Sequence, residues 1–280
     1  MKTLIASFAF VAVSLAVSGC SAEVDETNPS AQESQEGLTG ALPSDEQPGV
    51  VLIRSFSANG VGSCTGELIA PRVVLTAAHC FSSATTLVRV LPGYDHRATI
   101  RDGKEGLAAP RVEVHEKWTG DSAQGFDLAV VQLEKPLTSF SDKGPFALSP
   151  KTYTVSPLAI RRTALTNADL KQRIELVGYG LTINGVTGVT GASGESDQKR
   201  RGAASINAVS SGHIMVGGSA EQCPGDSGGP VLEKVNGQTR IVAISSYSDV
   251  KTGQLRCSRG MNTRLDVHAA WIDAKVAKLE

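Results

Sequence analysis

The chain has 280 residues, of which 41% are hydrophobic, so it is long enough to bury one large core or two smaller ones. Its 27 Lys and Arg residues nearly balance 28 Asp and Glu residues, which gives a formal net charge of -1. This balance provides no strong field for nucleic acid or for an acidic membrane surface, so we expect neither as a partner. We expect a monomer.

The N-terminus has the layout of an export signal. Lys2 precedes an apolar run over residues 4–17, and together they predict a signal peptide over residues 1–19 that is too short to remain as a membrane span. The four residues that end at Cys20 resemble a bacterial lipobox, so Cys20 is predicted to carry lipid and to attach the protein to a membrane. Because Ser21 follows Cys20, a Gram-negative organism would place this lipoprotein in its outer membrane. The alternative is a plain signal peptide that ends near a cysteine.

A polar segment follows the signal. Residues 20–37 are rich in Glu, Ser, Asp and Gln and contain few large apolar side chains, so the segment cannot offset its own ordering entropy. We interpret it as a flexible tether or propeptide, and we expect one folded domain over residues 38–280.

Within this domain, short apolar runs recur between turn signals, a pattern typical of an all-β sandwich or barrel pair. The predicted strands lie at residues 50–53, 67–69, 73–76, 87–91, 128–133, 174–177, 203–209 and 241–246. Only residues 266–279 are predicted to be helical, because their apolar side chains recur near one face. The glycine-rich residues 178–194 and the following residues 195–201 are predicted to form an exposed loop.

Three segments together carry the elements of serine-based amide hydrolysis, which needs a nucleophile, a base, a group that orients the base and donors for the oxyanion. Thr76-Ala77-Ala78-His79-Cys80 follows a predicted strand, Asp127 begins another, and Gly225-Asp226-Ser227-Gly228-Gly229-Pro230 forms a turn. A lone histidine or aspartate is more often structural. The three blocks in this order resemble those of the chymotrypsin/trypsin-like serine peptidases.

This resemblance implies an all-β fold of two six-stranded antiparallel barrels packed together, with a C-terminal α-helix. The first barrel would cover about residues 38–155, the second about 156–265, and the helix 266–279. It also implies a serine endopeptidase that works through an acyl-enzyme intermediate, acts on proteins or peptides and needs no cofactor or metal.

The catalytic roles follow residue by residue from the same resemblance. Ser227 would be the nucleophile, His79 the general base and then acid, and Asp127 the carboxylate that orients His79. The backbone N–H groups of Gly225 and Ser227 would form the oxyanion hole, since Gly225 is free to adopt the turn that this requires.

The cysteine count supports export. There are five cysteines, and lipidation of Cys20 would leave four that can pair in three ways in an oxidising compartment. Position alone does not choose between these pairings. The family resemblance implies disulfides Cys64–Cys80 and Cys223–Cys257.

Activation in this family joins the aspartate before the nucleophile, here Asp226, to an apolar N-terminus freed by proteolysis. The usual Ile-Val-Gly-Gly is absent, and the nearest substitute is Leu38-Thr39-Gly40-Ala41. We expect a cut near Gly37 that lets Leu38 pair with Asp226; the alternative is an atypical activation. No Lys or Arg lies between Lys2 and Arg54, so a trypsin cannot be the activator.

The substrate pocket is also expected by resemblance, with Glu221 at its floor, Ser246, Tyr247 and Ser248 along one wall, and Gly260 at the open far side. A buried carboxylate would favour Lys or Arg before the scissile bond. The alternative is that Glu221 is a solvated loop residue. For an enzyme that cuts after basic residues, residues 199–201 would be a self-cleavage site or merely a solvated charge run.

Two other functions remain as alternatives. A surface lipoprotein with a silent protease fold would serve in binding, although such proteins usually lose a residue of the triad or the oxyanion loop. An esterase with a Gly-x-Ser-x-Gly elbow needs its histidine after the serine, and here only His268 follows. The five histidines show no spacing typical of metal ligands.

Overall fold

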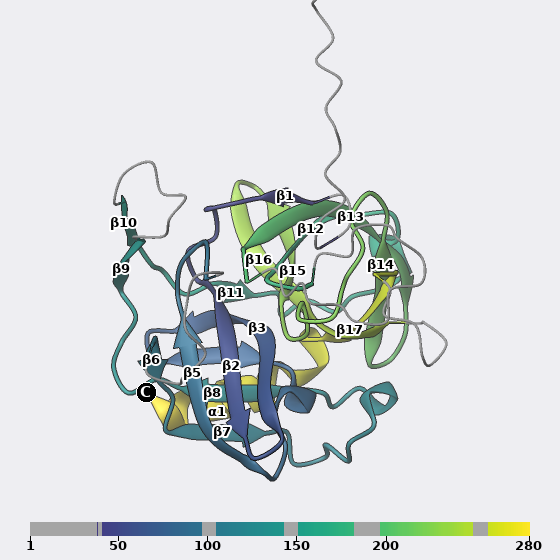
Figure 1. Ribbon diagram of the computed structural model, residues 1–280. Helices are drawn as coiled ribbons and strands as arrows, with labels where there is room; N and C mark the ends of the chain where they lie inside the picture. The colour runs from purple at the N-terminus through teal and green to yellow at the C-terminus, as the bar shows by residue number, and fades with distance from the viewer. Residues whose placement is uncertain (1–37, 39–40, 97–104, 143–150, 182–196, 249–256) are drawn as a thin grey trace, which may run out of the picture. The chain divides into compact units, whose positions relative to one another are not determined.

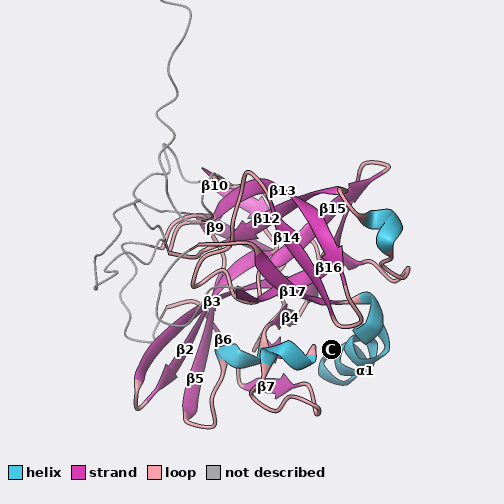
Figure 2. Cartoon of the chain, turned by 90° about the vertical axis from the view of Figure 1, so that its right-hand side faces the viewer, coloured by secondary structure: helices cyan, strands magenta, loops and turns pink. Residues whose placement is uncertain are grey.

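The computed structural model describes residue 38 and residues 41–96, 105–142, 151–181, 197–248 and 257–280. The predicted signal peptide, Cys20 and the tether of residues 20–37 therefore lie outside the described residues. Strands dominate the described residues (Figure 2), and their α-helix lies at the C-terminus, while the other helical segments are short 3₁₀ turns. Within the described ranges, no helix is long and apolar enough to cross a membrane.

The first sheet has the strand order β6-β5-β2-β3-β4-β8-β7 (Figure 1). Its strands are β2 (Val50–Ser57), β3 (Gly60–Ala70), β4 (Val73–Thr76), β5 (Thr85–Leu91), β6 (Leu107–Ala108), β7 (Arg111–Val114) and β8 (Ala129–Gln132). Only Ala109 and Pro110 separate the two edge strands, β6 and β7. Because Pro110 has no N–H to donate, the ladder is interrupted there. Since the two edge strands are only two residues apart in the chain, the two edges of the sheet lie close together, and the sheet curls on itself.

The second sheet closes into a six-stranded barrel, because β13 pairs with both β12 and β14. Its strands are β12 (Arg173–Gly178), β13 (Arg200–Val209), β14 (His213–Gly217), β15 (Pro230–Val235), β16 (Gln238–Ser248) and β17 (Gly260–Arg264). Two short strands extend it, β1 (Leu42–Pro43) on β13 and β11 (Ala159–Ile160) on β16. Strands β9 (Ser139–Asp142) and β10 (Lys151–Thr154) form a separate pair. The predicted all-β, two-barrel architecture is confirmed.

The two sheets share one hydrophobic cluster in which side chains of both meet. Val50, Leu75 and Leu128 of the first sheet's half lie in the same cluster as Leu232 and Ile244 of the second. The predicted closing helix is α1 (Ala269–Leu279), preceded by one 3₁₀ turn (Asp266–His268). Its Ile272 and Leu279 belong to the same cluster, so the helix closes the core.

The end of the helix is tied to the first sheet by hydrogen bonds. Gln132 Nε2 donates to the Leu279 carbonyl at 2.6 Å, and the Arg72 N–H donates to Glu280 Oε1 at 2.7 Å.

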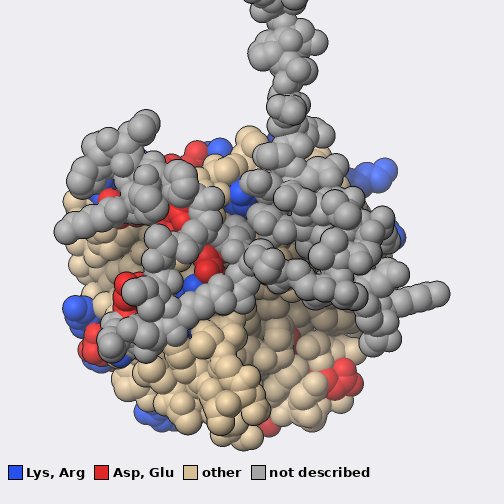
Figure 3. Space-filling model, in the orientation of Figure 1, with Lys and Arg blue, Asp and Glu red and all other residues tan. Residues whose placement is uncertain are grey.

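On the face drawn in Figure 3, the acidic and basic side chains of the described residues are scattered rather than gathered by sign.

The prediction of an exposed loop over residues 195–201 is wrong at its described end. Lys199 is 0% exposed and Arg200 is 3% exposed, and β13 begins at Arg200. Asp197 forms a buried ion pair with Arg54 at 2.6 Å. Burial lowers the pKa of Lys199 to about 8, and its Nζ donates to the Gln47 carbonyl. Lys199 and Arg200 therefore pack inward at the start of a strand, where their peptide bonds are poor targets for a protease, whereas the Arg201 side chain is 38% exposed and pairs with Glu46 and Glu175.

Glu67 of β3 is a buried carboxyl group without a partner. It is 0% exposed, and neither carboxyl oxygen has a hydrogen-bond partner among the described residues. Burial raises the pKa of Glu67 well above its ordinary value. Because the folded-state pKa exceeds the unfolded one, stability is lost as pH rises above about 4.

We therefore expect Glu67→Met to raise the free energy of unfolding by about 1–4 kcal/mol at pH 7 and to flatten its decline between pH 5 and pH 8, as measured by urea denaturation. Glu233 is a matched control, because it is 1% exposed but forms ion pairs with Arg161 and Arg240. Glu233→Met should destabilise the protein, since it removes one of two carboxylates from the buried Arg161 and takes the partner of Arg240 away. A destabilised Glu67→Met variant would contradict the prediction.

Candidate active site

His79 and Asp127 meet because the strands that carry them pair. Strands β4 and β8 align Thr76 with Ala129, so the segments after Thr76 and before Ala129 lie side by side. His79 lies in a single 3₁₀ turn, Ala78–Cys80. Its backbone N–H donates to Asp127 Oδ1 at 2.9 Å, and its Nδ1 lies 2.7 Å from Asp127 Oδ2. Two hydrogen bonds therefore fix the imidazole against the carboxylate.

The Asp127 carboxylate is fully buried and receives two further hydrogen bonds. Ser246 Oγ donates to Oδ2 at 2.5 Å, and Ser122 Oγ donates to it at 3.3 Å. Burial alone would raise the pKa of Asp127, but the hydrogen bonds from His79 and Ser246 outweigh this and lower it. An ionised Asp127 requires Nδ1 of His79 to carry a proton, which leaves Nε2 free to accept one. The imidazole is 31% exposed, so Nε2 is open to a substrate.

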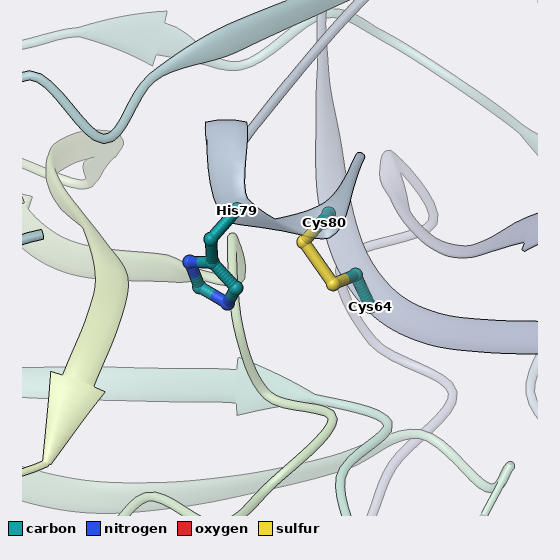
Figure 4. A group of neighbouring side chains, drawn as sticks. All are labelled: Cys64, His79 and Cys80. Carbon is teal, nitrogen blue, oxygen red and sulfur yellow. A yellow bond between two sulfur atoms is a disulfide. The ribbon is translucent and has the colours of Figure 1, made fainter. Parts of the chain in front are cut away.

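Both implied disulfides are present in the structure. Cys64 pairs with Cys80, and Cys223 pairs with Cys257. Figure 4 shows Cys80 on the same short turn as His79, with the imidazole directed away from the disulfide. The ligand atoms of Cys64, His79 and Cys80 lie within 4.8 Å of one another, but the two sulfurs are bonded to each other and are not thiolates. With the disulfide formed, this group lacks the ligands that a metal needs.

The serine block forms a tight loop whose glycines are required by its geometry. Gly225 has φ of 97° and Gly228 has φ of 78°, values that favour glycine. The Asp226 N–H donates to the Cys223 carbonyl, and the Gly229 N–H donates to the Asp226 carbonyl. The N–H groups of Gly225 and Ser227 have no acceptor among the described residues. The loop thus leaves two backbone donors available for an oxyanion.

The loop of the second barrel sits directly against the His79 segment of the first. The Thr65 N–H donates to the Ser227 carbonyl at 2.9 Å. A Cβ on Gly228 would lie 2.1 Å from Thr76 Oγ1 and 2.7 Å from the Ala77 nitrogen. Within the described ranges no hydrogen bond joins Ser227 Oγ to His79, and such bonds often tighten only when substrate binds.

Asp226 points into the core behind the oxyanion loop. Its carboxylate accepts the N–H of Gly180 at 2.8 Å and that of Cys223 at 2.9 Å. Burial raises the pKa of Asp226 to about 7, although both N–H groups and the charge of Arg200 oppose the rise. Leu38, the proposed new N-terminus, is 1% exposed and packs in the core cluster of the second barrel. The Leu38 side chain is therefore buried in the core of the second barrel in the uncut chain.

The residues predicted to line the substrate pocket do not all lie where the sequence analysis expected them. Glu221 is half-buried. Ser246 was expected only as a wall, but its hydroxyl points at Asp127. Tyr247 packs edge-on against His213 at 5.5 Å, and Ser248 is exposed.

The expectation that Gly260 leaves an open far side is wrong. Gly260 is buried, and a Cβ on it would lie 1.4 Å from Gln222 Oε1, so the Gln222 side chain fills that space. Gln222 is 6% exposed and donates through Nε2 to Asn262 Oδ1 at 2.8 Å. Sequence reasoning missed Gln222, Asn262 and Ser122, because isolated amides and hydroxyls carry no motif. The position of Gln222 between Glu221 and Cys223 was the only available signal.

These features define a serine protease: two barrels, a His–Asp pair and a glycine-bounded serine loop. The family model described as Trypsin matches residues 45–272, and the chain therefore belongs to the trypsin family. The chain is 28% identical over 226 residues to chymotrypsin-like elastase family member 1 of Bos taurus, covering 77% of this chain and 79% of the relative. It is 27% identical over 224 residues to the protein of that name in Rattus norvegicus, with the same two coverages.

Proposed function

We propose that this protein is a serine endopeptidase that hydrolyses peptide bonds through an acyl-enzyme intermediate. The observation that carries the proposal is the buried Asp127 carboxylate bonded to His79, beside a serine loop with two unpaired backbone N–H groups. The described residues therefore supply each group that this chemistry needs: a nucleophile, a base, a carboxylate that orients the base, and donors for the oxyanion.

In the proposed mechanism, Ser227 Oγ attacks the carbonyl carbon of the substrate while His79 Nε2 takes the hydroxyl proton. The carbonyl oxygen becomes an oxyanion held by the N–H groups of Gly225 and Ser227. His79 then gives its proton to the leaving amine, which breaks the peptide bond and leaves an ester on Ser227. Water attacks this ester by the same route, with His79 as base, and releases the acid.

The test uses a peptide phosphonate that reacts only with an activated serine. We expect stoichiometric labelling of Ser227, located by mass spectrometry of a digest, and loss of peptidase activity in proportion. Ser227→Ala should remain unlabelled. Absence of labelling and cleavage in both intact and N-terminally cut protein would favour the silent, binding lipoprotein.

We also propose that cleavage before Leu38 activates the enzyme. The Leu38 side chain is already buried in the core of the second barrel, and Asp226, on the loop between β14 and β15 of the same barrel, is 2% exposed. An ammonium group that pairs with the Asp226 carboxylate would remove the penalty of its burial and would lower its pKa from about 7.

Insertion of a specific protease site before Leu38 tests this step. Cutting is expected to raise kcat/KM about 100-fold, the usual effect of one oxyanion donor. Asp226→Asn should abolish the gain. Stability of the uncut protein should fall as pH rises from about 4 to 7, because the folded pKa of Asp226 is raised, and the cut protein should lose less. Cutting after Ser30 instead is the control and should change neither property.

We further propose export as a lipoprotein through Cys20, with release when the tether is cut. Two disulfides support an extracytoplasmic location, because they persist in oxidising compartments. Cys20→Ala is expected to move the protein from the membrane fraction to the soluble exported fraction. A membrane-bound Cys20→Ala protein would contradict lipidation at this residue.

The sequence-based preference for Lys or Arg before the scissile bond depends on Glu221 alone. A competing preference arises from Gln222, the buried polar side chain that the structure places beside Gly260. Glu221→Gln should lower cleavage after Lys and Arg selectively if Glu221 decides specificity.

A further inference from the structure

The side chain of Gln222 crosses the region expected to receive the substrate. Its backbone pairs with Ser258 through hydrogen bonds of 3.0 Å in both directions, and the neighbouring Cys223–Cys257 disulfide joins the same two segments. From this strand-like position the side chain reaches Gly260 of β17. Gln222 therefore bridges the segment that carries Glu221 and the far wall of the predicted pocket.

The hydrogen bonds of Asn262 fix which way the Gln222 amide points. Asn262 is 0% exposed, and its Nδ2 donates to the carbonyls of Gly260 at 2.8 Å and Ile214 at 3.4 Å. Both N–H groups of Asn262 are thus used, and its Oδ1 must face a donor, which is Gln222 Nε2. The amide oxygen of Gln222 is directed the other way.

Gln222 Oε1 is a buried acceptor without a partner in the described structure. Such an atom is costly to leave unsatisfied, and a buried site with an unpaired acceptor discriminates strongly between ligands that do and do not donate to it. The oxygen lies against Gly260, which pairs with Ser248 of the expected wall. An unsatisfied acceptor therefore lies beside the expected wall of the substrate pocket.

We propose that Gln222, held by Asn262, determines specificity by accepting a hydrogen bond from the residue before the scissile bond. This inference rests on the proposed peptidase function. The preferred residue has a short, uncharged side chain with a donor: Ser, Thr or Asn. A long basic side chain that extends toward Glu221 must displace the Gln222 amide and break its bond to Asn262.

The experiment compares peptides that differ only in the residue before the scissile bond. The Thr and Val side chains have nearly the same shape. The ratio of kcat/KM for the Thr peptide to kcat/KM for the Val peptide therefore reports the hydrogen bond to Gln222 Oε1. We expect the wild-type protein, cut before Leu38 where necessary, to prefer Thr by about tenfold, and to cleave after Lys more slowly than after either.

Two variants separate the roles of shape and hydrogen bonding. Gln222→Met keeps much of the length but removes the acceptor, so the Thr/Val ratio should fall to about one while the rate for Val is retained. Gln222→Ser removes the bridge and should increase cleavage after Lys at least about tenfold. The rate of phosphonate labelling at Ser227 and the thermal midpoint serve as controls for folding.

The outcomes distinguish this inference from the proposed function. Labelling of Ser227 together with preferred cleavage after Lys, Arg or Phe, or equal rates for Thr and Val, would overturn the role of Gln222 and leave the peptidase intact. Absence of both labelling and cleavage would overturn both proposals.

Discussion

Asp127→Asn is expected to lower kcat about 10,000-fold while the protein remains folded. In the structure, every close donor to this side chain is arranged for a carboxylate: the His79 N–H faces one oxygen, and His79 Nδ1 and Ser246 Oγ face the other. An asparagine has only one oxygen, so its NH2 group must oppose a donor. When the amide oxygen keeps the hydrogen bond from the His79 backbone N–H, the NH2 group faces His79 Nδ1. Nδ1 must then act as the acceptor, so the imidazole carries its proton on Nε2. A protonated Nε2 cannot accept the proton of Ser227.

The measurements are kcat and kcat/KM on peptides and the rate of phosphonate labelling, with urea denaturation to show that folding is preserved. Two serines provide graded controls. Ser246→Ala removes a bond of 2.5 Å and should reduce kcat about tenfold, whereas Ser122→Ala removes one of 3.3 Å and should have a smaller effect. An Asp127→Asn enzyme within tenfold of wild-type activity would exclude the orienting role.

Periodicity predicted eight of the strands, but it missed short strands such as β14 and β15, although their Ile214, Val216, Val231 and Leu232 are buried apolar residues. Each of the eight predicted runs lies in or overlaps a strand, from residues 50–53 in β2 to residues 241–246 in β16. Strand β17 was missed because Asn262 and Thr263, both 0% exposed, replace the expected apolar residues. The polar side chain of Asn262 is stabilised there by hydrogen bonds to distant segments, which local sequence does not reveal.

The candidate active site likewise contains residues that the sequence revealed and residues that it did not. Contiguous blocks pointed to His79, Asp127 and Ser227, because tight backbone geometry leaves a motif in the sequence. Ser246 and Gln222 left none, since the partner of Ser246 lies 119 residues away in the chain and that of Gln222 lies 40 away. Arg200 was misplaced for a related reason: its charge suggested solvent, but strand pairing carries it inward.

Gly228→Ala is the second substitution with a large expected effect, because it separates the two halves of the site. The added Cβ would lie 2.1 Å from Thr76 Oγ1 and 2.5 Å from the Thr65 carbonyl oxygen, and both groups belong to the first barrel. Thr76 Oγ1 already donates to the Thr65 carbonyl at 2.7 Å, so neither group is free to withdraw without breaking that bond. The serine loop must therefore move away from His79.

A displacement of about 1 Å at the nucleophile costs about 100-fold in rate, so we expect kcat/KM to fall by at least that factor. Gly237 gives a matched control: its φ of 79° equals that of Gly228 within a degree, but a Cβ there would meet nothing within 4 Å. Gly237→Ala should share the backbone strain and lower stability by about 1 kcal/mol, with activity unchanged. Equal losses of activity in both variants would assign the effect to backbone strain rather than to contact between the barrels. A loss confined to Gly228→Ala would show that Ser227 reaches His79 only because no side chain stands between the loop and Thr76.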